Sequence, residues 1–317
     1  MSIPKPDLIG GEEYIYESLL GNGSFGKVYK CKNKKGQLLA IKRIKDEQAT
    51  LEAKIMSSLN GPEYKEYFVQ FYKLFKSYDG ATCIVMEYCE LGSLEDVDLR
   101  PICNDHDKTI NHYFAQLIEG VKKLHKVELM HRDLKPANIL LTKIDEKIRL
   151  KIADFGLARD SPLVSTNLTI CGSRCYMAPE VSKGYRYDKS VDIYSLGGIR
   201  YFMLMRKHPI GLQFDKCGYP KIKDGHNSLI GRMLCQRKEE RLKLDEITLI
   251  NGIFSFKRIN CSICTKGGDE QNTKGEGYNN QNNNNNNQKQ RQEGGFDYRI
   301  VVLVGFIAVV FLAILKR

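Results

Sequence analysis

Residues 130–138, MHRDLKPAN, constrain the fold of this chain more than any other stretch. They place an aspartate, a lysine and an asparagine in one short loop, between an apolar helical pattern and the apolar run 139–141. Taken alone, such a loop has a simpler interpretation, a capped turn with a surface salt bridge, because short motifs recur by chance. Its meaning therefore depends on what stands at set distances along the rest of the chain.

Four further motifs accompany this loop in a set order. The glycine run 21–26 and Lys42 precede it, and the motifs DFG (154–156) and APE (178–180) follow it. With five ordered motifs at these separations, the chain resembles the eukaryotic protein kinase superfamily over residues 14–256. The resemblance implies an α+β, two-lobed protein kinase fold, with a small mainly β N-terminal lobe, a larger mainly α C-terminal lobe, and ATP and Mg²⁺ as cofactors.

Residues 14–44 read as three strands separated by turns, after a lead-in, residues 1–13, that we expect to be loose. Glycines in the first turn let the backbone approach phosphates where a Cβ would collide. Dinucleotide-binding folds also use GxGxxG but place a helix directly after it, whereas a strand pattern follows here and favours the kinase type. The resemblance assigns this stretch to the ATP site: Leu20, Gly21, Asn22, Gly23, Ser24, Phe25, Gly26, Lys27 and Val28.

Lys42 ends a short apolar strand, where an exposed lysine would be the default interpretation without the glycine loop upstream. By the resemblance, Lys42 pairs with the α and β phosphates, and Val28 and Ala40 cover the adenine. Kinases also need a glutamate on a helix to hold this lysine, and Glu52, on an apolar helical stripe, is the expected residue. Because only ten positions separate it from Lys42, Glu47 is a second candidate and a solvent-facing Glu52 stays an alternative.

Residues 83–94 resemble the kinase hinge. By that resemblance, Met86 stands at the back of the adenine pocket, and backbone groups of Glu87 and Cys89 hydrogen-bond the adenine edge. Leu140 is assigned to the same site. Backbone contacts tolerate many side chains, so the hinge is the least specific part of the match, and Cys89 is otherwise an ordinary buried thiol.

The resemblance also gives the loop residues their roles. Asp133 is the catalytic base for the substrate hydroxyl, and Lys135 neutralises the transferring phosphoryl group. Asn138 and Asp154 are the metal ligands. His131 is expected to pack and hydrogen-bond, not to transfer a proton.

Lys135 two positions after Asp133 resembles serine/threonine kinases, because tyrosine kinases place alanine or arginine nearby. Protein serine and threonine hydroxyls are therefore the expected substrates. A phosphate added between DFG and APE would pair with Arg132 and order that segment. The alternative is that these hydroxyls are only solvated, as in most hydroxyl-rich loops. The candidate hydroxyls are Ser161, Ser165, Thr166, Thr169 and Ser173.

Residues farther along resemble supports of a kinase active site. Asp192 resembles the buried aspartate that holds the catalytic loop through its backbone, and Glu180 and Arg241 resemble the pair that ties the activation segment to the lower lobe. His125 is expected as a helix-end residue. Only 49 positions separate Asp192 from Arg241, so we expect abbreviated helices between them and substrate docking unlike that of better-known relatives.

Charge and cysteine content limit the partners and the compartment. The formal net charge is +11, of which residues 257–317 hold +4, so no single tail carries the excess. Because the positive charge is spread along the whole chain, it does not indicate nucleic acid as a partner. Ten scattered cysteines without an N-terminal apolar segment predict free thiols in a reducing compartment, and Cys261 with Cys264 falls short of four zinc ligands.

The composition changes after Phe256. Residues 257–298 are rich in asparagine, glycine and charge, so they predict a disordered linker. In residues 299–317, sixteen consecutive apolar or glycine residues, 300–315, span about 24 Å as a helix, and flanking Tyr298 and basic residues extend this towards the ~30 Å bilayer core. We predict a single C-terminal transmembrane helix, a tail anchor in a lipid bilayer with the kinase domain facing the cytosol. One alternative is a buried core helix, but no domain is left beyond the linker to bury it. Another is a GPI signal, which would require prior entry into the secretory pathway.

The whole sequence therefore predicts a membrane-bound serine/threonine protein kinase, with parts that resemble NIMA-related kinases and parts that resemble membrane-bound ER stress kinases. A pseudokinase scaffold is one alternative; it predicts a lost metal or phosphate ligand, and none is lost. A membrane tether whose asparagine-rich segment recruits partners is the other. The organelle, the substrate protein and the oligomeric state stay open.

Overall fold

The computed structural model describes residues 3–9, 12–23, 26–44, 48–100, 106–158, 173–222 and 228–256. The chain divides into two units, Met1–Gly275 and Glu276–Arg317, and every described residue belongs to the first. The predicted linker and transmembrane helix lie outside the described residues. Within the described ranges, no helix combines the length and apolar character that crossing a bilayer requires.

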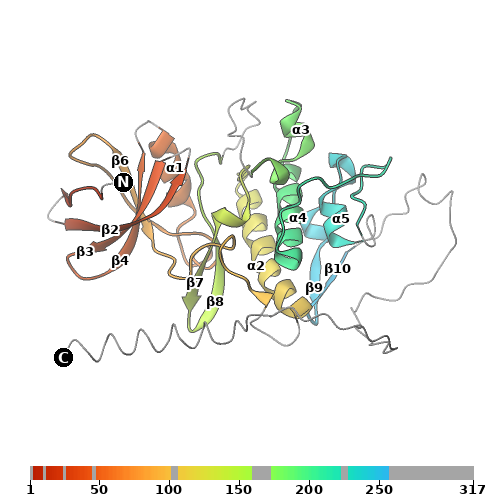
Figure 1. Cartoon of the computed structure of the whole chain (residues 1–317), viewed down its shortest axis with the longest axis horizontal. Helices are drawn as coiled ribbons and strands as arrows, with labels where there is room; N and C mark the ends of the chain where they lie inside the picture. The colour runs from red at the N-terminus through yellow and green to blue at the C-terminus, as the bar shows by residue number, and fades with distance from the viewer. Residues whose placement is uncertain are drawn as a thin grey trace, which may run out of the picture. The chain divides into compact units, whose positions relative to one another are not determined.

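The first lobe is a six-stranded antiparallel sheet with one helix (Figure 1). The strand order is β1-β2-β3-β4-β6-β5, and helix α1 (Gln48–Ser58) packs against β5 and β6. The small β lobe predicted from the sequence is therefore confirmed. Its strands are β1 (Asp7–Ile9), β2 (Glu12–Gly23), β3 (Gly26–Asn33), β4 (Leu38–Ile44), β5 (Phe71–Lys76) and β6 (Thr82–Glu87).

The lead-in that we expected to be loose is part of this sheet, so that prediction was wrong. Strand β1 pairs with the start of β2, and Asp7 is only 1% exposed. Hydrogen bonds to the buried Asp7 side chain hold β1 in the sheet. Arg43, Tyr16 and Ser77 each donate one to the Asp7 carboxylate, at 2.9, 2.6 and 2.6 Å. Arg43 and Ser77 lie 36 and 70 positions farther along the chain, where a local pattern cannot show them.

Strand β4 is buried on both faces because the sheet covers two apolar clusters. Ala40 and Ile44 belong to the main core shared with α1, whereas Leu39 and Ile41 belong to a second cluster on the opposite face. Side chains alternate along a strand, so consecutive residues of β4 serve different faces of the sheet.

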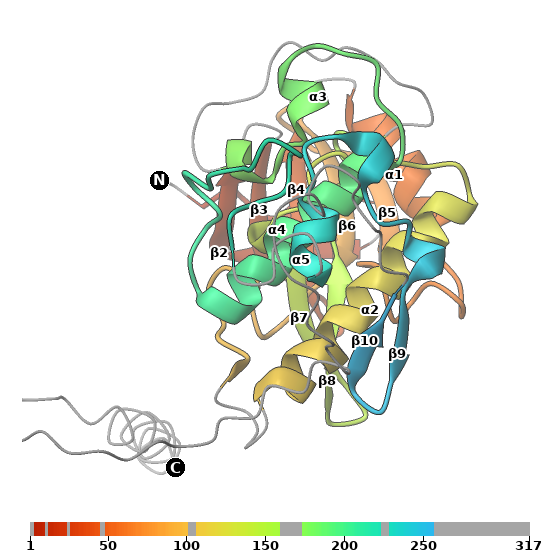
Figure 2. The same ribbon diagram turned by 90° about the vertical axis from the view of Figure 1, so that its right-hand side faces the viewer.

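The second lobe is built on two long helices, α2 (His106–Lys126) and α4 (Ser190–Met205), which pack against one another. Figure 2 shows the hairpin β9–β10 beside α2, where the rings of Phe114 and Phe254 meet at 5.8 Å. The remaining elements are β7 (Ile139–Ile144), β8 (Lys147–Ile152), α3 (Pro179–Ser182), α5 (Leu229–Met233), β9 (Thr248–Ile250) and β10 (Ile253–Ser255).

The connection from α4 to Arg241 is short of helices, as the spacing predicted. Among the described residues of this stretch, 206–222 and 228–240, the only α-helix is the five-residue α5. The loop after α4 is partly buried, since Cys217 and Tyr219 are each 1% exposed, and its His208 lies 2.9 Å from the hydroxyl of Tyr176, just before APE.

Candidate active site

The structure joins Lys42, Glu52 and Asp154 in one cluster. The Lys42 Nζ lies 2.7 and 2.8 Å from the two Glu52 carboxylate oxygens and 2.8 Å from the Asp154 Oδ1. These residues come from β4, from α1 and from the segment after β8. Glu52 is 2% exposed, which excludes the solvent-facing alternative, and Glu47 lies outside the described residues.

The cluster sets the charge of its own members. Burial lowers the pKa of Lys42, but Asp154 and Glu52 outweigh that effect, so the pKa lies above its ordinary value. Burial would likewise raise the pKa of Asp154, but the Lys42 charge holds it below the ordinary value. An ammonium and an ionised carboxylate therefore stand side by side at neutral pH, as a phosphate and a divalent cation require.

The loop residues Asp133, Lys135 and Asn138 contact one another directly. The Lys135 Nζ donates to Asp133 Oδ2 at 2.8 Å, and the Asn138 Nδ2 donates to the same oxygen at 3.0 Å. A 3-10 turn, Pro136–Asn138, leads from the loop into β7. Because the amide nitrogen of Asn138 faces Asp133, its amide oxygen is the atom available to a cation.

Asp192 supports this loop from α4, as expected. Its carboxylate accepts the backbone N–H groups of His131 and Arg132, both at 2.9 Å, and lies 2.8 Å from the His125 Nε2. Burial raises the pKa of Asp192, but His125 and the loop lower it below the ordinary value. His125, predicted only as a helix-end residue, thus also contacts the aspartate that holds the catalytic loop.

Two residues beside the chemistry have left-handed backbones, which non-glycine residues adopt at a cost of about 1–3 kcal/mol. They are Arg132, with φ +67°, and Asp154, with φ +64°. Asp192 holds the first through its N–H, and Lys42 holds the carboxylate of the second. No sequence signal marked either backbone.

His131 packs where the resemblance placed it. Its ring is fully buried, 5.1 Å from the ring of Phe155, and its Nε2 lies 2.9 Å from the backbone oxygen of Ala153. His131 therefore connects the catalytic loop to the DFG segment through packing and a hydrogen bond.

The glycine turn has both open and crowded positions. A Cβ on Gly21 or Gly23 would meet no heavy atom within 4 Å, so these backbones are free for close approach. Gly26 has φ +128°, and a Cβ there would lie 2.3 Å from the Arg43 carbonyl oxygen, so only glycine fits. The predicted residues Ser24 and Phe25 lie outside the described residues.

The hinge residues follow the end of β6. Met86 is buried opposite Ala40 in the strand register, and Leu140 is half-buried on β7. The Glu87 N–H donates to the Gln70 carbonyl at 2.9 Å. Burial raises the pKa of the Cys89 thiol to about 12. The ATP-site roles of these residues stay predictions.

One buried ion pair in this region was missed from the sequence. The Lys151 Nζ on β8 lies 2.5 and 2.6 Å from the two Glu87 carboxylate oxygens. It ties the hinge to the strand that leads into DFG. The available signal was weak: Lys151 stands between the apolar residues Leu150 and Ile152, in a strand that is buried at this end.

Glu180 and Arg241 form the expected bidentate pair, with N–O distances of 2.5 and 2.7 Å. The Arg241 guanidinium also lies 5.0 Å from the ring centre of Tyr194, a cation–π contact.

Of the predicted phosphorylation candidates, Ser161, Ser165, Thr166 and Thr169 lie outside the described residues. Arg132 donates to the Leu157 carbonyl and the Tyr187 hydroxyl.

These residues fit ATP with Mg²⁺. Open space above Gly21 and Gly23 suits phosphates, and the Lys42 ammonium is the charge they require. The Asp154 carboxylate and the Asn138 amide oxygen are hard oxygen donors, which Mg²⁺ prefers. Within the described residues no cluster of three or more His, Cys, Asp or Glu side chains forms a metal site.

Comparison with known proteins agrees with this geometry. The family profile described as protein kinase domain matches residues 14–250. The probable serine/threonine-protein kinase zyg-1 of Caenorhabditis elegans is 33% identical over 80% of this chain and 35% of its own length. NUAK family SNF1-like kinase 2 of Rattus norvegicus is 36% identical over 67% of this chain and 34% of its own length.

The serine/threonine-protein kinase Nek8 of Danio rerio is 33% identical over 60% of this chain and 28% of its own length, which supports the expected likeness to NIMA-related kinases. The chain spans about a third of the length of the first curated relatives it matches.

Proposed function

Because the chain belongs to the protein kinase family, we propose that it is an active serine/threonine protein kinase that transfers the γ-phosphoryl group of ATP to protein hydroxyls. The observation that carries this proposal is the ion-pair cluster of Lys42 with Glu52 and Asp154, in the same unit as the interlocked loop Asp133–Lys135–Asn138. A pseudokinase would be expected to have lost a member of this set.

The residues divide the work by their charges. Bound Mg²⁺ neutralises charge on the β and γ phosphates. Lys42 orients the phosphates, and Glu52 keeps Lys42 in place. Asp154 and Asn138 hold the metal, Asp133 accepts the proton of the attacking hydroxyl, and Lys135 offsets charge on the transferred group.

The test is transfer of radiolabel from ATP to a generic protein substrate. For Asp133→Asn we expect a loss of about 10²- to 10⁴-fold, because that is the usual contribution of a positioned base. Thermal protection by ATP with Mg²⁺ should persist in this variant. The matched control is Glu146→Gln, an exposed carboxylate in the β7–β8 turn, which should leave activity unchanged.

Two outcomes would overturn the proposal. One is wild-type protein that gains no thermal protection from ATP with Mg²⁺ and incorporates no label. The other is incorporation that survives Asp133→Asn undiminished, because the label would then come from a contaminating kinase.

We further propose that residues 299–317 anchor the enzyme in a bilayer. The support is the sequence itself, since Arg299 precedes the sixteen apolar or glycine residues and Lys316 and Arg317 follow them. The full chain should stay with membranes through alkaline carbonate extraction, whereas a chain ending at residue 298 should be released. Both should phosphorylate the generic substrate equally, and release of the full chain would refute the anchor.

A further inference from the structure

The hairpin β9–β10 ends the described part of the second lobe, and its two strands meet in a two-residue turn. Asn251 and Gly252 form this turn with φ of +51° and +79°, the left-handed conformations that a type I′ turn requires. Ile250 and Ile253 flank the turn and pair with one another in the strand register. The turn lies at the lower edge of the lobe in Figures 1 and 2.

Specific contacts hold this hairpin on the lobe. The Asn111 Nδ2 of α2 donates to the Gly252 carbonyl at 2.8 Å. The ring of Phe254 packs against Phe114 of α2, and the Arg200 guanidinium of α4 lies 5.1 Å from the ring centre of Phe254. The turn and the two isoleucines beside it are therefore held in one place on the folded lobe.

The isoleucines beside the turn face solvent. Ile250 is 59% exposed and Ile253 is 44% exposed, and Leu249 of the same hairpin is 37% exposed. Paired residues of an antiparallel ladder share a face, so the two isoleucines form one apolar surface. Among the described residues, Phe254 and Phe256 pack against the main core, whereas Ile250 and Ile253 do not. The fold thus leaves these two side chains unused.

The sequence places a long apolar run at a limited distance from this hairpin. Phe256 is the last described residue, and residues 257–299 separate it from the run 300–315. A flexible chain of that length has an r.m.s. end-to-end distance of about 35 Å. A bilayer that holds the apolar run would therefore stay within reach of the hairpin, and such a tether populates even a weak contact by raising the effective concentration.

The chemistry around the turn suits the interface of a bilayer. Isoleucine gains free energy when it leaves water for the boundary between headgroups and acyl chains. The exposed polar residues of the hairpin, Thr248, Asn251 and Ser255, can stay at the level of the headgroups. Lys108 lies beside the turn, since a Cβ on Gly252 would meet its Cγ at 3.1 Å. A lysine stem can cover apolar surface while its ammonium reaches the headgroups.

The size of the apolar surface favours lipid over a second protein. A stable protein interface buries about 800 Å² on each partner and needs a complementary surface, which two isoleucines and one leucine cannot supply. A bilayer needs no complementary surface. The carboxylates nearest in sequence, Asp245 and Glu246, precede β9 and so stand at the base of the hairpin and not at its turn.

We propose that the turn of β9–β10 is a second membrane contact, in which Ile250 and Ile253 insert between lipid headgroups and acyl chains and fix the orientation of the kinase domain on the bilayer. The proposal rests on the proposed anchor at residues 299–317, which supplies the bilayer, and goes beyond it by naming the surface that faces the lipid. Alone, so small a contact is weak and reversible, and the tether makes it persist.

The chain contains no tryptophan, so a single introduced one reports only on its own surroundings. The full chain carrying Ile253→Trp is reconstituted in phosphatidylcholine vesicles, with and without phosphatidylserine. We expect its emission to shift to shorter wavelength. We also expect quenching by lipids brominated about 5–10 Å below the headgroups, the depth of an interfacial side chain. Adding Ile250→Asp to this chain should abolish both effects, and thermal melting checks that the fold is kept.

The matched control is Tyr185→Trp in the full chain. Tyr185 is 63% exposed, and its N–H donates to the carbonyl of Glu180 in α3. Helix α3 lies at the opposite edge of the lobe from the hairpin turn in Figures 1 and 2. We expect this tryptophan to emit as in water and to escape quenching by the brominated lipids.

Three outcomes would overturn the contact. One is solvent-like, unquenched emission of Ile253→Trp in a chain that resists alkaline carbonate, which leaves the anchor standing. The second is a shift to shorter wavelength without quenching by brominated lipid, because a protein surface would then cover the turn. The third is equal quenching of Tyr185→Trp. If carbonate releases the full chain, the anchor is refuted, and the quenching recorded before extraction still decides for or against the hairpin contact.

Discussion

Lys42 and Arg43 follow one another on β4, and both are nearly buried, at 5% and 8% exposure. Each contacts two carboxylates. Lys42 pairs with Glu52 and Asp154, while Arg43 pairs with Asp7 and Asp79 on the opposite face of the sheet. The same chemistry therefore occurs twice within two residues.

The two networks differ in where their partners come from and in how completely they are closed. Arg43 donates to Asp7, to the Tyr16 hydroxyl, to Ser77 and to both oxygens of Asp79, all within the first lobe. Lys42 instead joins a helix to a residue of the second lobe, and the Asp154 side chain is 29% exposed. A planar guanidinium suits a permanent tie, whereas an ammonium is a point charge that a phosphate can share.

The largest expected effect separates the two networks by activity. Lys42→Met should reduce kcat by about 10²- to 10³-fold, because it removes a charge that stabilises the transferring phosphates. Arg43→Met should change the kcat of the folded protein by less than about threefold, because its network faces away from that charge. Radiolabel transfer, normalised to folded protein, measures both. Equal losses in the two variants would show that the networks are not independent.

The second effect concerns stability. Arg43→Met should lower the free energy of unfolding by about 3–5 kcal/mol, because it leaves the Asp7 carboxylate buried and unpaired. The double variant Asp7→Leu, Arg43→Met should recover part of this loss, since no buried charge is then left without its partner. Urea denaturation of all three proteins gives the values. A double variant no more stable than Arg43→Met would contradict this account.

The third effect is a pH dependence of Lys42→Met. In the wild-type chain the lowered pKa of Asp154 stabilises the fold at neutral pH, and this contribution is lost only as the pH falls through that lowered pKa. Without Lys42, burial remains and raises the pKa, so the variant gains stability as the pH falls towards the unfolded value of about 3.9.

The difference in unfolding free energy between wild type and Lys42→Met should therefore shrink from about pH 7.5 to about pH 4.5, by roughly 1 kcal/mol. Urea denaturation at the two pH values measures it. A difference that stays constant would mean that Lys42 does not control the ionisation of Asp154.

The smallest effect is expected at an exposed pair of the same sheet. Lys30 and Glu17 lie 3.0 Å apart, with side chains 28% and 34% exposed. Lys30→Ala should cost less than about 1 kcal/mol and should become neutral in high salt, because exposed ion pairs are screened. A larger loss of unfolding free energy that did not depend on salt would contradict this account. It would show that burial does not explain the difference between this pair and the two networks of β4.

The same two neighbours show what could be read from the sequence. Lys42 was recognised because a glycine turn and a strand pattern stand at set distances before it, and Glu52 followed because the helix stripe placed it. Arg43 had no such pattern. Its partner Asp7 lies in a polar, proline-containing stretch, and polar networks are formed by residues far apart in sequence.

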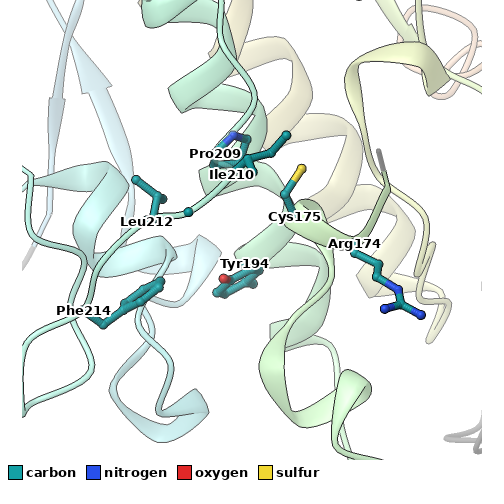
Figure 3. A pocket seen from close by; sticks show the side chains of 8 residues that line it. Arg174, Cys175, Tyr194, Pro209, Ile210, Leu212 and Phe214 are labelled. Atoms are coloured by element: carbon teal, nitrogen blue, oxygen red, sulfur yellow. The ribbon is translucent and has the colours of Figure 1, made fainter. Parts of the chain in front are cut away.

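A pocket of about 410 Å³, lined by Arg174, Cys175, Tyr194 and the loop after α4, shows the other limit (Figure 3). The spacing of 49 positions from Asp192 to Arg241 predicted few helices and substrate docking unlike that of better-known relatives. It did not place Phe214 and Leu212 beside Cys175, because that arrangement depends on the turn at Arg206 and on the contact between Tyr176 and His208. Spacing reports how much chain is available, whereas side-chain contacts decide its path.

The hinge thiol has a consequence for chemical probes. Burial raises the pKa of the Cys89 thiol to about 12, so the thiolate, which is the nucleophilic form, is scarce at pH 7. Electrophilic inhibitors aimed at this sulfur would therefore react slowly, even when bound beside it.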